Sequence, residues 1–217
     1  MSGPSAKIIA PRVAAIRELA AKAGRNPAEI LMFSMFTIVL GRTEAEAAAK
    51  YAEYRRHVSH EGALTLMSGW TGVDFSTYDL DQQVRHVQND AGRTAMDNIT
   101  RADPDRVWTV REVAEHVGIG GIGPVVVGTP EKVADEIEAW FEQTGVDGLN
   151  VPFAISPGDF EDITEMLVPE LVRRGRYKTA YQPGTLREKL YGAGRARLTA
   201  PHPAASYRYK ARAAAAE

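Results

Sequence analysis

The stretch HVGIGGIGPVVVGTPEKV, His116 to Val133, decides the fold of this chain because its glycines fit two structures. Gly118, Gly120 and Gly123 have the G-x-G-x-x-G spacing of a dinucleotide-binding loop. Such a loop needs a strand that runs into the first glycine and a helix that starts at the last one. The elements on either side of the glycines therefore decide between the two structures.

These flanking elements are predicted in the opposite order. Thr109–Glu112 has the form of a capping box and predicts the start of a helix. One face of that helix carries the apolar residues Val110, Val113, Ala114 and Val117. Gly118 is expected to end it in a left-handed conformation. The β-branched run Val125–Val127 then predicts a short extended segment, so we interpret the glycines as a flexible loop and not as a cofactor site.

A first strand–helix unit is predicted upstream. The apolar segment Ile30–Leu40 predicts a strand buried on both faces, although its periodicity alone also fits a buried helix. The capping box Thr43–Glu46 follows at once and predicts a helix that extends to about His57. Another helix is expected before this unit, from Pro11 to Ala23.

A second unit is predicted after the glycine loop. Its elements are a helix from Thr129 to Gly145, a strand over Val146–Phe153, and a helix capped by Asp159 and closed by Gly175. Pro169 should kink or shorten the last helix. Strand–helix alternation predicts an α/β fold with a parallel sheet and helices outside it. The insertion between the units, residues 62–123, has the length of a lid or binding loop.

The composition excludes several classes of function. The 217 residues include no cysteine, which rules out disulfides, zinc thiolate sites and cysteine nucleophiles. A net charge of −2 argues against a dedicated nucleic-acid partner. The longest apolar run is too short to span a membrane and the first residues lack an apolar signal core. We therefore expect a cytoplasmic protein, with residues 193–217 as a basic, flexible tail.

Three segments in a fixed order resemble the C-terminal end of the bacterial luciferase-like flavin monooxygenases. They are VVGTPEKVADEI, GVDGLNV and FEDITEMLVPELVRRG. Ser68–Asp81, Gly41–Ala47 and Thr185–Leu190 are also similar to the nitrilotriacetate, pristinamycin and dibenzothiophene-sulfone monooxygenase branch. The resemblance covers roughly Lys7 to Gly192, so we predict residues 1–192 as one portion of such a protein.

The resemblance implies a partial (β/α)₈ TIM barrel, because members of the family are complete barrels of about twice this length. This chain would supply the last two strand–helix units and the helical insertion. In the family, a separate flavin reductase supplies reduced FMN, which reacts with O₂ to oxygenate a small organic substrate. The residues that grip the flavin are expected on the missing strands, so this chain alone is not expected to be active.

Partners follow from the incomplete sheet, because its unpaired edges invite pairing with another chain. We expect the N-terminal half of the barrel, or a homo-oligomer, to cover them. The leading prediction is the C-terminal segment of a two-component FMN-dependent monooxygenase. The alternatives are a flavin-free remnant that acts as an interaction or regulatory subunit, and an independent small α/β binding domain.

The candidate substrate-binding residues come from two places. Asn150 and Phe153 lie at the carboxyl end of the second predicted strand, where barrel enzymes place their sites. Trp70, Asp74 and Phe75 lie in a glycine-containing segment that fits a lid. The competing interpretation of Asn150 is a strand-end amide that bonds to the backbone. The competing interpretation of the segment with Trp70 and Phe75 is a loop packed by its own aromatic rings.

Catalytic residues are not assigned by the sequence. His57 and His60 are three positions apart on the predicted helix, but no further ligand accompanies them, so no metal is expected. His86 and His116 are expected on helices of the insertion.

Overall fold

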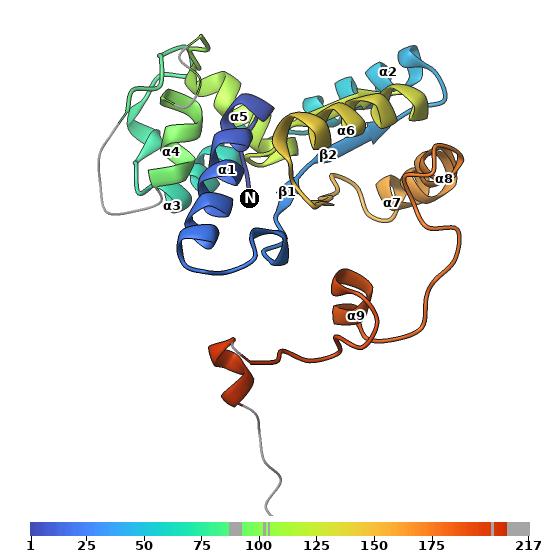
Figure 1. The fold of residues 1–217 in the computed structure, drawn as a ribbon. Helices are drawn as coiled ribbons and strands as arrows, with labels where there is room; N and C mark the ends of the chain where they lie inside the picture. Colours follow the sequence, from blue (N-terminus) through green and yellow to red (C-terminus); the bar gives the residue numbers. More distant parts are fainter. Residues whose placement is uncertain (87–92, 102, 104, 201, 208–217) are drawn as a thin grey trace, which may run out of the picture. The chain divides into compact units, whose positions relative to one another are not determined.

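The computed structural model describes residues 1–86, 93–101, 103, 105–200 and 202–207 (Figure 1). At its centre is one extended segment made of β1 (Phe33–Met35) and β2 (Thr37–Leu40). Phe36 separates the two strands, and all four residues of β2 are buried. The predicted strand over Ile30–Leu40 is therefore too long, because Ile30 still caps the short 3₁₀ turn η1 (Pro27–Glu29).

The central segment pairs with two other strands, both parallel to it. β1 pairs with β4 (Gly148–Asn150), and β2 pairs with β3 (Val125–Gly128). At the junction, the Phe36 N–H donates to the Asn150 carbonyl and the Thr37 N–H to the Pro124 carbonyl. In a barrel that follows chain order β3 and β4 would pair with each other, whereas among the described residues each pairs with the central segment.

β4 is much shorter than the predicted strand over Val146–Phe153. The Asp147 N–H still donates to the Met32 carbonyl. The Met32 N–H, however, donates to the Asp147 carboxylate, which also accepts from Arg17, so the main-chain ladder does not continue here. Pro152 has no N–H to donate, which ends the strand on the other side. The strand is thus limited to the three residues that match β1 in register.

Helices α1 (Ala6–Lys22) and α6 (Pro130–Thr144) form the main core with these strands. α6 runs along β2 (Figure 1) and brings the Trp140 ring edge-on to Phe36, with ring centroids 5.5 Å apart. α1 begins five residues before the predicted Pro11, because Ile8 and Ile9 are also buried. The predicted helix from Thr43 is confirmed as α2 (Glu44–Arg56), with Thr43 as its cap.

The last helix of the second predicted strand–helix unit is interrupted, as Pro169 predicts. α7 (Gly158–Asp162) passes into a π-helical turn, η3 (Ile163–Leu167), and then into α8 (Val168–Arg173). Pro169 lacks an N–H and its ring crowds the preceding turn, which the wider π turn accommodates. Glu170 accepts hydrogen bonds from Arg173 and Arg174, and these guanidinium groups lower the pKa of Glu170 to about 2.

The insertion has a small core of its own. Its described elements are α3 (His60–Thr71), η2 (Phe75–Thr77), α4 (Arg93–Thr100) and α5 (Val110–Gly120). Their buried side chains form a second apolar cluster around Met67, Phe75 and Trp108. The two histidines expected on one helix are instead separated, because His57 caps the end of α2 and His60 begins α3. His86 lies outside the helices, and His116 lies in α5.

The structure divides into two compact units, Met1–Tyr177 and Lys178–Glu217. The second contains the short helix α9 (Leu186–Tyr191) and the 3₁₀ turn η4 (Pro203–Ser206). A capping box at Thr185 starts α9, and none of its residues is buried. The prediction of a tail from residue 193 onward stays a prediction, and residues 208–217 lie outside the described ones.

The glycine stretch has the predicted order of elements, with one correction. α5 continues two residues past Gly118, and the left-handed residue is Gly121, with φ +59°. Gly118 and Gly120 are instead sites of close contact. A Cβ on Gly118 would overlap with Val58, and one on Gly120 would overlap with the Cγ2 methyl of Val125. The pattern thus reflects tight packing of α5 against its neighbours.

We predict that Gly120→Ala lowers the free energy of unfolding by about 1–3 kcal/mol, because the stiff Val125 side chain cannot move aside. Gly69→Ala is the matched control, since Gly69 lies in α3 with open space around its Cα. The control should stabilise the chain by about 0.5–1 kcal/mol. Urea unfolding followed by circular dichroism measures both, and an equal effect of the two changes would contradict the close packing.

We predict that Phe36→Ala lowers the free energy of unfolding by about 3–5 kcal/mol, because Phe36 is 1% exposed and packs on Trp140. Leu19→Ala, at a side chain that is 65% exposed on α1, should change it by less than about 0.5 kcal/mol. Denaturant titration followed by far-ultraviolet circular dichroism compares them. A small effect of Phe36→Ala would show that the core is not centred on the strand junction.

Candidate functional site

The carboxyl ends of β2 and β3 are tied together by one carboxylate. Gly41 follows β2, and its N–H donates to the Gly128 carbonyl at 3.2 Å. Glu44, at the start of α2, accepts from the Thr129 N–H at 3.0 Å and from Lys132 at 2.7 Å. Both bonds to Glu44 lower its pKa, that from Lys132 the more strongly. This edge of the sheet is rigid and its charges are paired.

The carboxyl end of β4 carries two of the predicted site residues. Asn150 is exposed at the last position of the strand, and its main-chain carbonyl accepts from the Phe36 N–H. Phe153 is 50% exposed three residues later. Its ring lies 4.9 Å from that of Phe160 on α7, centroid to centroid. The loop after β4 therefore presents aromatic surface to solvent.

Asp159 holds this loop in place. It is 3% exposed, and its Oδ2 accepts hydrogen bonds from the N–H groups of Ala154 at 2.7 Å and Ile155 at 2.9 Å. Its Oδ1 accepts from the Tyr54 hydroxyl on α2 at 2.7 Å. Burial and this hydrogen bond raise the pKa of Tyr54 above its ordinary value, so the phenol keeps its proton. Asp159 therefore bonds to the loop and to α2, and is not the helix cap that the sequence predicts, since Pro157 holds that position.

The three predicted lid residues lie in the insertion. Trp70 is 40% exposed near the end of α3. Asp74 caps η2 through the Ser76 N–H, and Phe75 is 1% exposed in the core of the insertion, against Tyr78. No hydrogen bond or ring contact among the described residues joins these three to Asn150 or Phe153. Their role as a lid stays a prediction.

Sequence reasoning missed the partners of Phe153. Phe160 and Ile155 are exposed beside it, and Tyr54 comes from a helix about a hundred residues away in the chain. The sequence signal for this exposed apolar group was the presence of Phe153, Ile155 and Phe160 in and just after a turn-forming segment. The Tyr54–Asp159 bond left no signal in the sequence, because it joins residues from two separate units of the pattern.

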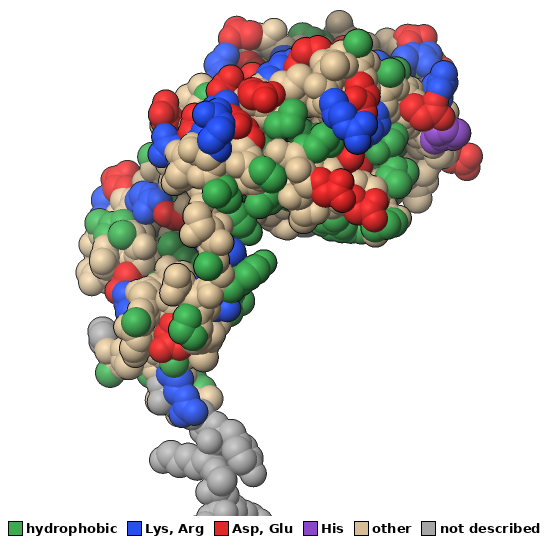
Figure 2. All heavy atoms as spheres, turned by 90° about the vertical axis from the view of Figure 1, so that its right-hand side faces the viewer, with side chains coloured by type: hydrophobic (Ala, Val, Ile, Leu, Met, Phe, Trp, Pro, Cys, Tyr) green, Lys and Arg blue, Asp and Glu red, His purple; other side chains and the backbone are tan. Residues whose placement is uncertain are grey.

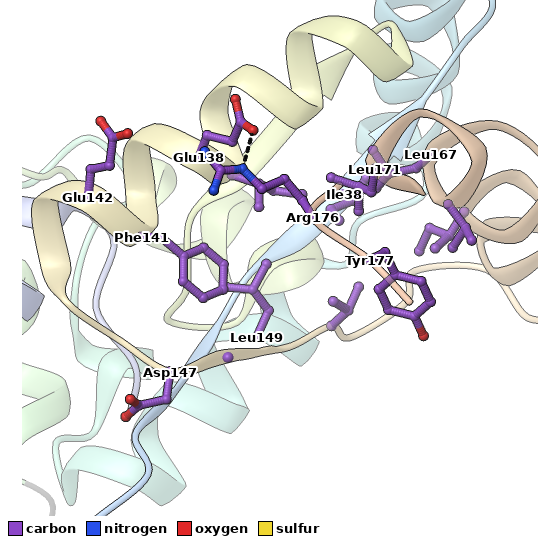
Figure 3. Close-up of a pocket in the computed structure, with 15 residues that line it drawn as sticks. Ile38, Glu138, Phe141, Glu142, Asp147, Leu149, Leu167, Leu171, Arg176 and Tyr177 are labelled. Atoms are coloured by element: carbon purple, nitrogen blue, oxygen red, sulfur yellow. Dashed lines mark hydrogen bonds and ion pairs between the residues drawn. The ribbon is translucent and has the colours of Figure 1, made fainter. Parts of the chain in front are cut away.

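A cavity of about 640 Å³ lies between α6, β4 and the helical segment formed by η3 and α8 (Figure 3). Phe141 and Leu149 point into it from two sides, and Leu167 and Leu171 close a third. At its rim the Arg176 Nε donates to Glu138 at 2.7 Å. Neither Asn150 nor Phe153 lines it, although Leu149 and Val151, on either side of Asn150, do. Its lining contains no histidine, serine or lysine, and its acidic side chains are Glu138, Glu142 and Asp147.

The surface around this region mixes apolar and charged groups. In the space-filling view, hydrophobic side chains gather along the lower side of the first unit, below a band of acidic and basic side chains (Figure 2). Ion pairs such as Lys50–Asp162 and Arg174–Glu138 belong to this unit. The charges are thus largely paired with each other, while apolar groups face solvent.

The glycine-rich segment does not form a phosphate cradle. The space that a phosphate would need beside Gly120 is filled by Val125. Beside Gly123, the Met35 side chain lies 3.0 Å from the position of a Cβ. FMN, expected from the resemblance, therefore finds no phosphate site in this segment. The helix that would point its N–H groups at a phosphate starts at Pro130, after the strand.

The described residues contain no group of three or more His, Cys, Asp or Glu side chains placed to hold a metal ion. His57 bonds to Glu53 at 2.8 Å, and His60 lies 4.0 Å from Glu115. Within the same described residues, no helix is long and apolar enough to cross a membrane.

The pKa of His116 departs clearly from its ordinary value. Burial, with a smaller contribution from the charge of Arg106, lowers it to about 4, against an opposing hydrogen bond with the Gly123 backbone. Its ring stands edge-on to Trp108 at 5.2 Å, and its Nε2 is buried without a hydrogen-bond partner in the described structure. His116 is therefore neutral and part of the core of the insertion.

Comparison with known proteins supports the resemblance. The family model "Luciferase-like monooxygenase" matches residues 1–148. The dimethyl-sulfide monooxygenase of Hyphomicrobium sulfonivorans is 44% identical over 193 residues, which are 89% of this chain and 40% of that protein. The long-chain alkane monooxygenase of Geobacillus thermodenitrificans is 38% identical, with the same two shares. The chain thus spans about 40% of the length of these curated relatives.

Solved structures agree with these matches. The crystal structure of DmoA from Hyphomicrobium sulfonivorans has a TM-score of 0.81 and 41% identity, covering 95% of this chain and 44% of that one. A riboflavin lyase, solved with modified FMN and riboflavin, also has a TM-score of 0.81, with 31% identity over 97% of this chain and 46% of that one. Nitrilotriacetate and dibenzothiophene-sulfone monooxygenases also match, so the predicted branch is confirmed.

We predict that acid destabilises the chain through His116. Its folded-state pKa lies below the ordinary value of 6.5, so the unfolded chain binds the proton first as the pH falls. The free energy of unfolding should therefore fall between about pH 6.5 and pH 4, by up to about 3 kcal/mol from this group. Urea unfolding at a series of pH values measures the slope. His116→Gln should lack this part of the slope, and an unchanged slope would contradict a buried neutral His116.

Proposed function

The chain belongs to the luciferase-like monooxygenase family, and on that premise we propose that it is the C-terminal segment of a two-component, FMN-dependent monooxygenase. In this proposal the complete protein uses reduced FMN from a separate flavin reductase, and O₂, to oxygenate a small organic substrate. The observation that carries the proposal is the exposed aromatic pair Phe153–Phe160 at the carboxyl end of a parallel strand, in a chain of this family. Barrel enzymes place their substrates at that end.

The partial-barrel arrangement is part of the proposal. The compact unit Met1–Tyr177 supplies four short strands in two parallel pairs, with the helices that cover them, and a family barrel needs eight strands. The free edges of β3 and β4 would pair with the N-terminal half of the barrel or with a second copy of the chain. β4 would then exchange its neighbour β1 for the strands that flank it in a closed barrel.

The proposal divides the work between the two portions of the protein. The filled spaces beside Gly120 and Gly123 mean that this glycine segment does not supply the phosphate grip for FMN. Its contribution is instead the loop after β4, with Asn150 and Phe153, and the insertion that carries Trp70, Asp74 and Phe75. These residues would shape and cover the substrate side of the pocket.

A second candidate follows from the same glycine packing. A family remnant that binds no flavin, and that serves as an interaction or regulatory subunit, would also lack a phosphate grip. It differs from the first candidate in one respect, since it would assemble with a partner without creating a flavin site.

The test is co-expression of this chain with the portion of the Hyphomicrobium relative that it does not match. We expect a complex in which FMN fluorescence is quenched saturably, with an affinity at least about tenfold above that of this chain alone. The quenching should appear only in the complex, because each portion alone lacks part of the site.

Val39→Pro is the control variant, because a proline in buried β2 removes a ladder hydrogen bond and should prevent assembly. Gly69→Ala, in open space on α3, should assemble and quench like the natural chain. A stable complex that leaves FMN fluorescence unchanged would reject the monooxygenase segment and favour the remnant.

A further inference from the structure

Three apolar side chains close together in the sequence are exposed after β4. Phe153 and Ile155 are each 50% exposed, and Phe160 on α7 is 42% exposed. The rings of Phe153 and Phe160 are in contact, with centroids 4.9 Å apart and planes inclined by 52°. We call these three residues the aromatic wall. Single exposed apolar residues are common, but a contiguous group marks a binding surface.

The loop that carries the wall is held more firmly than an ordinary surface loop. The buried carboxylate of Asp159 accepts two hydrogen bonds from the loop's backbone and one from Tyr54. Burying a carboxylate is costly unless such donors compensate it. The loop conformation is therefore fixed from beneath, by α7 and α2, while the side chains of the wall remain in solvent.

The charges of this segment exclude one class of ligand. Residues 151–162 contain no lysine, arginine or histidine, and they contain the acidic residues Asp159, Glu161 and Asp162. Lys50, which α2 brings to this segment, is already paired with Asp162. A carboxylate-bearing ligand would find no free cation there and would meet negative charge. An uncharged apolar ligand would bury the rings at no electrostatic cost.

We propose that the aromatic wall is the part of the substrate pocket that selects an uncharged, apolar substrate, such as a thioether or a hydrocarbon. Phe153, Ile155 and Phe160 contact the substrate in this proposal. Asp159 and Tyr54 are positioning residues that act through the loop. The inference rests on the proposed function, because it takes the carboxyl end of β4 as the substrate side of the site.

The test measures ligand binding without flavin, so that it does not depend on the oxygenation reaction. Saturation-transfer NMR, with the chain alone and with the co-expressed complex, compares diethyl sulfide with citrate as probes of the two chemical classes. We expect diethyl sulfide to bind at least about tenfold more tightly than citrate. Phe153→Ala and Phe160→Ala should each weaken its binding about fivefold, because each removes one ring of the wall.

Two matched controls separate the wall from general effects. Leu19→Ala changes a side chain on α1 that is 65% exposed, and should leave binding unchanged. Tyr54→Phe removes only the hydroxyl that donates to Asp159, and should weaken diethyl sulfide binding about two- to threefold by loosening the loop. Tyr51→Phe, on the same helix, should have no effect. Circular dichroism and the unfolding midpoint of each variant verify that it is folded.

The outcomes distinguish this inference from the proposed function. Tighter binding of citrate, no binding of diethyl sulfide, or equal effects of Phe153→Ala and Leu19→Ala would each overturn the aromatic wall. If diethyl sulfide binds in the expected pattern while the complex leaves FMN unbound, the wall stands and the monooxygenase assignment fails. If FMN binds and citrate is preferred, the assignment stands and the wall fails.

Discussion

The structure depends on the main-chain pairing of one segment, residues 33–40, with two different strands. β4 bonds to its first half and β3 to its second, and the change occurs between Phe36 and Thr37. Because both partners use this segment, each of the two strand–helix units is anchored to the same backbone. The Phe36 ring, buried at the change-over and packed on Trp140, joins that junction to α6. Loss of the central segment would separate every other element of the sheet.

The helices could be predicted closely from the sequence, and the strands could not. Thr43, Thr109 and Thr129 each accept a hydrogen bond from a backbone N–H in the first helical turn, a local interaction that three or four residues specify. Strand limits depend instead on register with a distant partner, which left Ile30–Met32 and Val151–Phe153 outside the ladders although both are apolar. Gly118 failed as a helix end for the same reason, since its close neighbour Val58 is remote in sequence.

The candidate site was predicted in part, and the reason is again the range of the interactions. The position of Asn150 and Phe153 follows from a general rule about strand ends, which needs only the strand to be found. Phe75 matched an aromatic lid by composition, but whether a ring faces solvent or a core depends on the helices α3 and α5 that enclose it. The bond from Tyr54 to Asp159 crosses about a hundred residues and has no local pattern.

The packing of the glycines and the fixed loop after β4 both agree with the proposed division of labour, in which this chain shapes the substrate side and another portion of the protein binds the cofactor. Where Val125 and Met35 fill the space beside Gly120 and Gly123, the backbone of this segment cannot approach a phosphate. Asp159 fixes the backbone of the loop after β4 and so keeps the rings of Phe153 and Phe160 exposed at a defined place. Exposed apolar rings of this kind are suited to contact with an apolar partner. In the proposed barrel, the strands that pair with the free edges of β3 and β4 would also cover the rings of Phe153 and Phe160. In the proposed assembly, the chain would hold one side of the site, and the strands that pair with it would form the other.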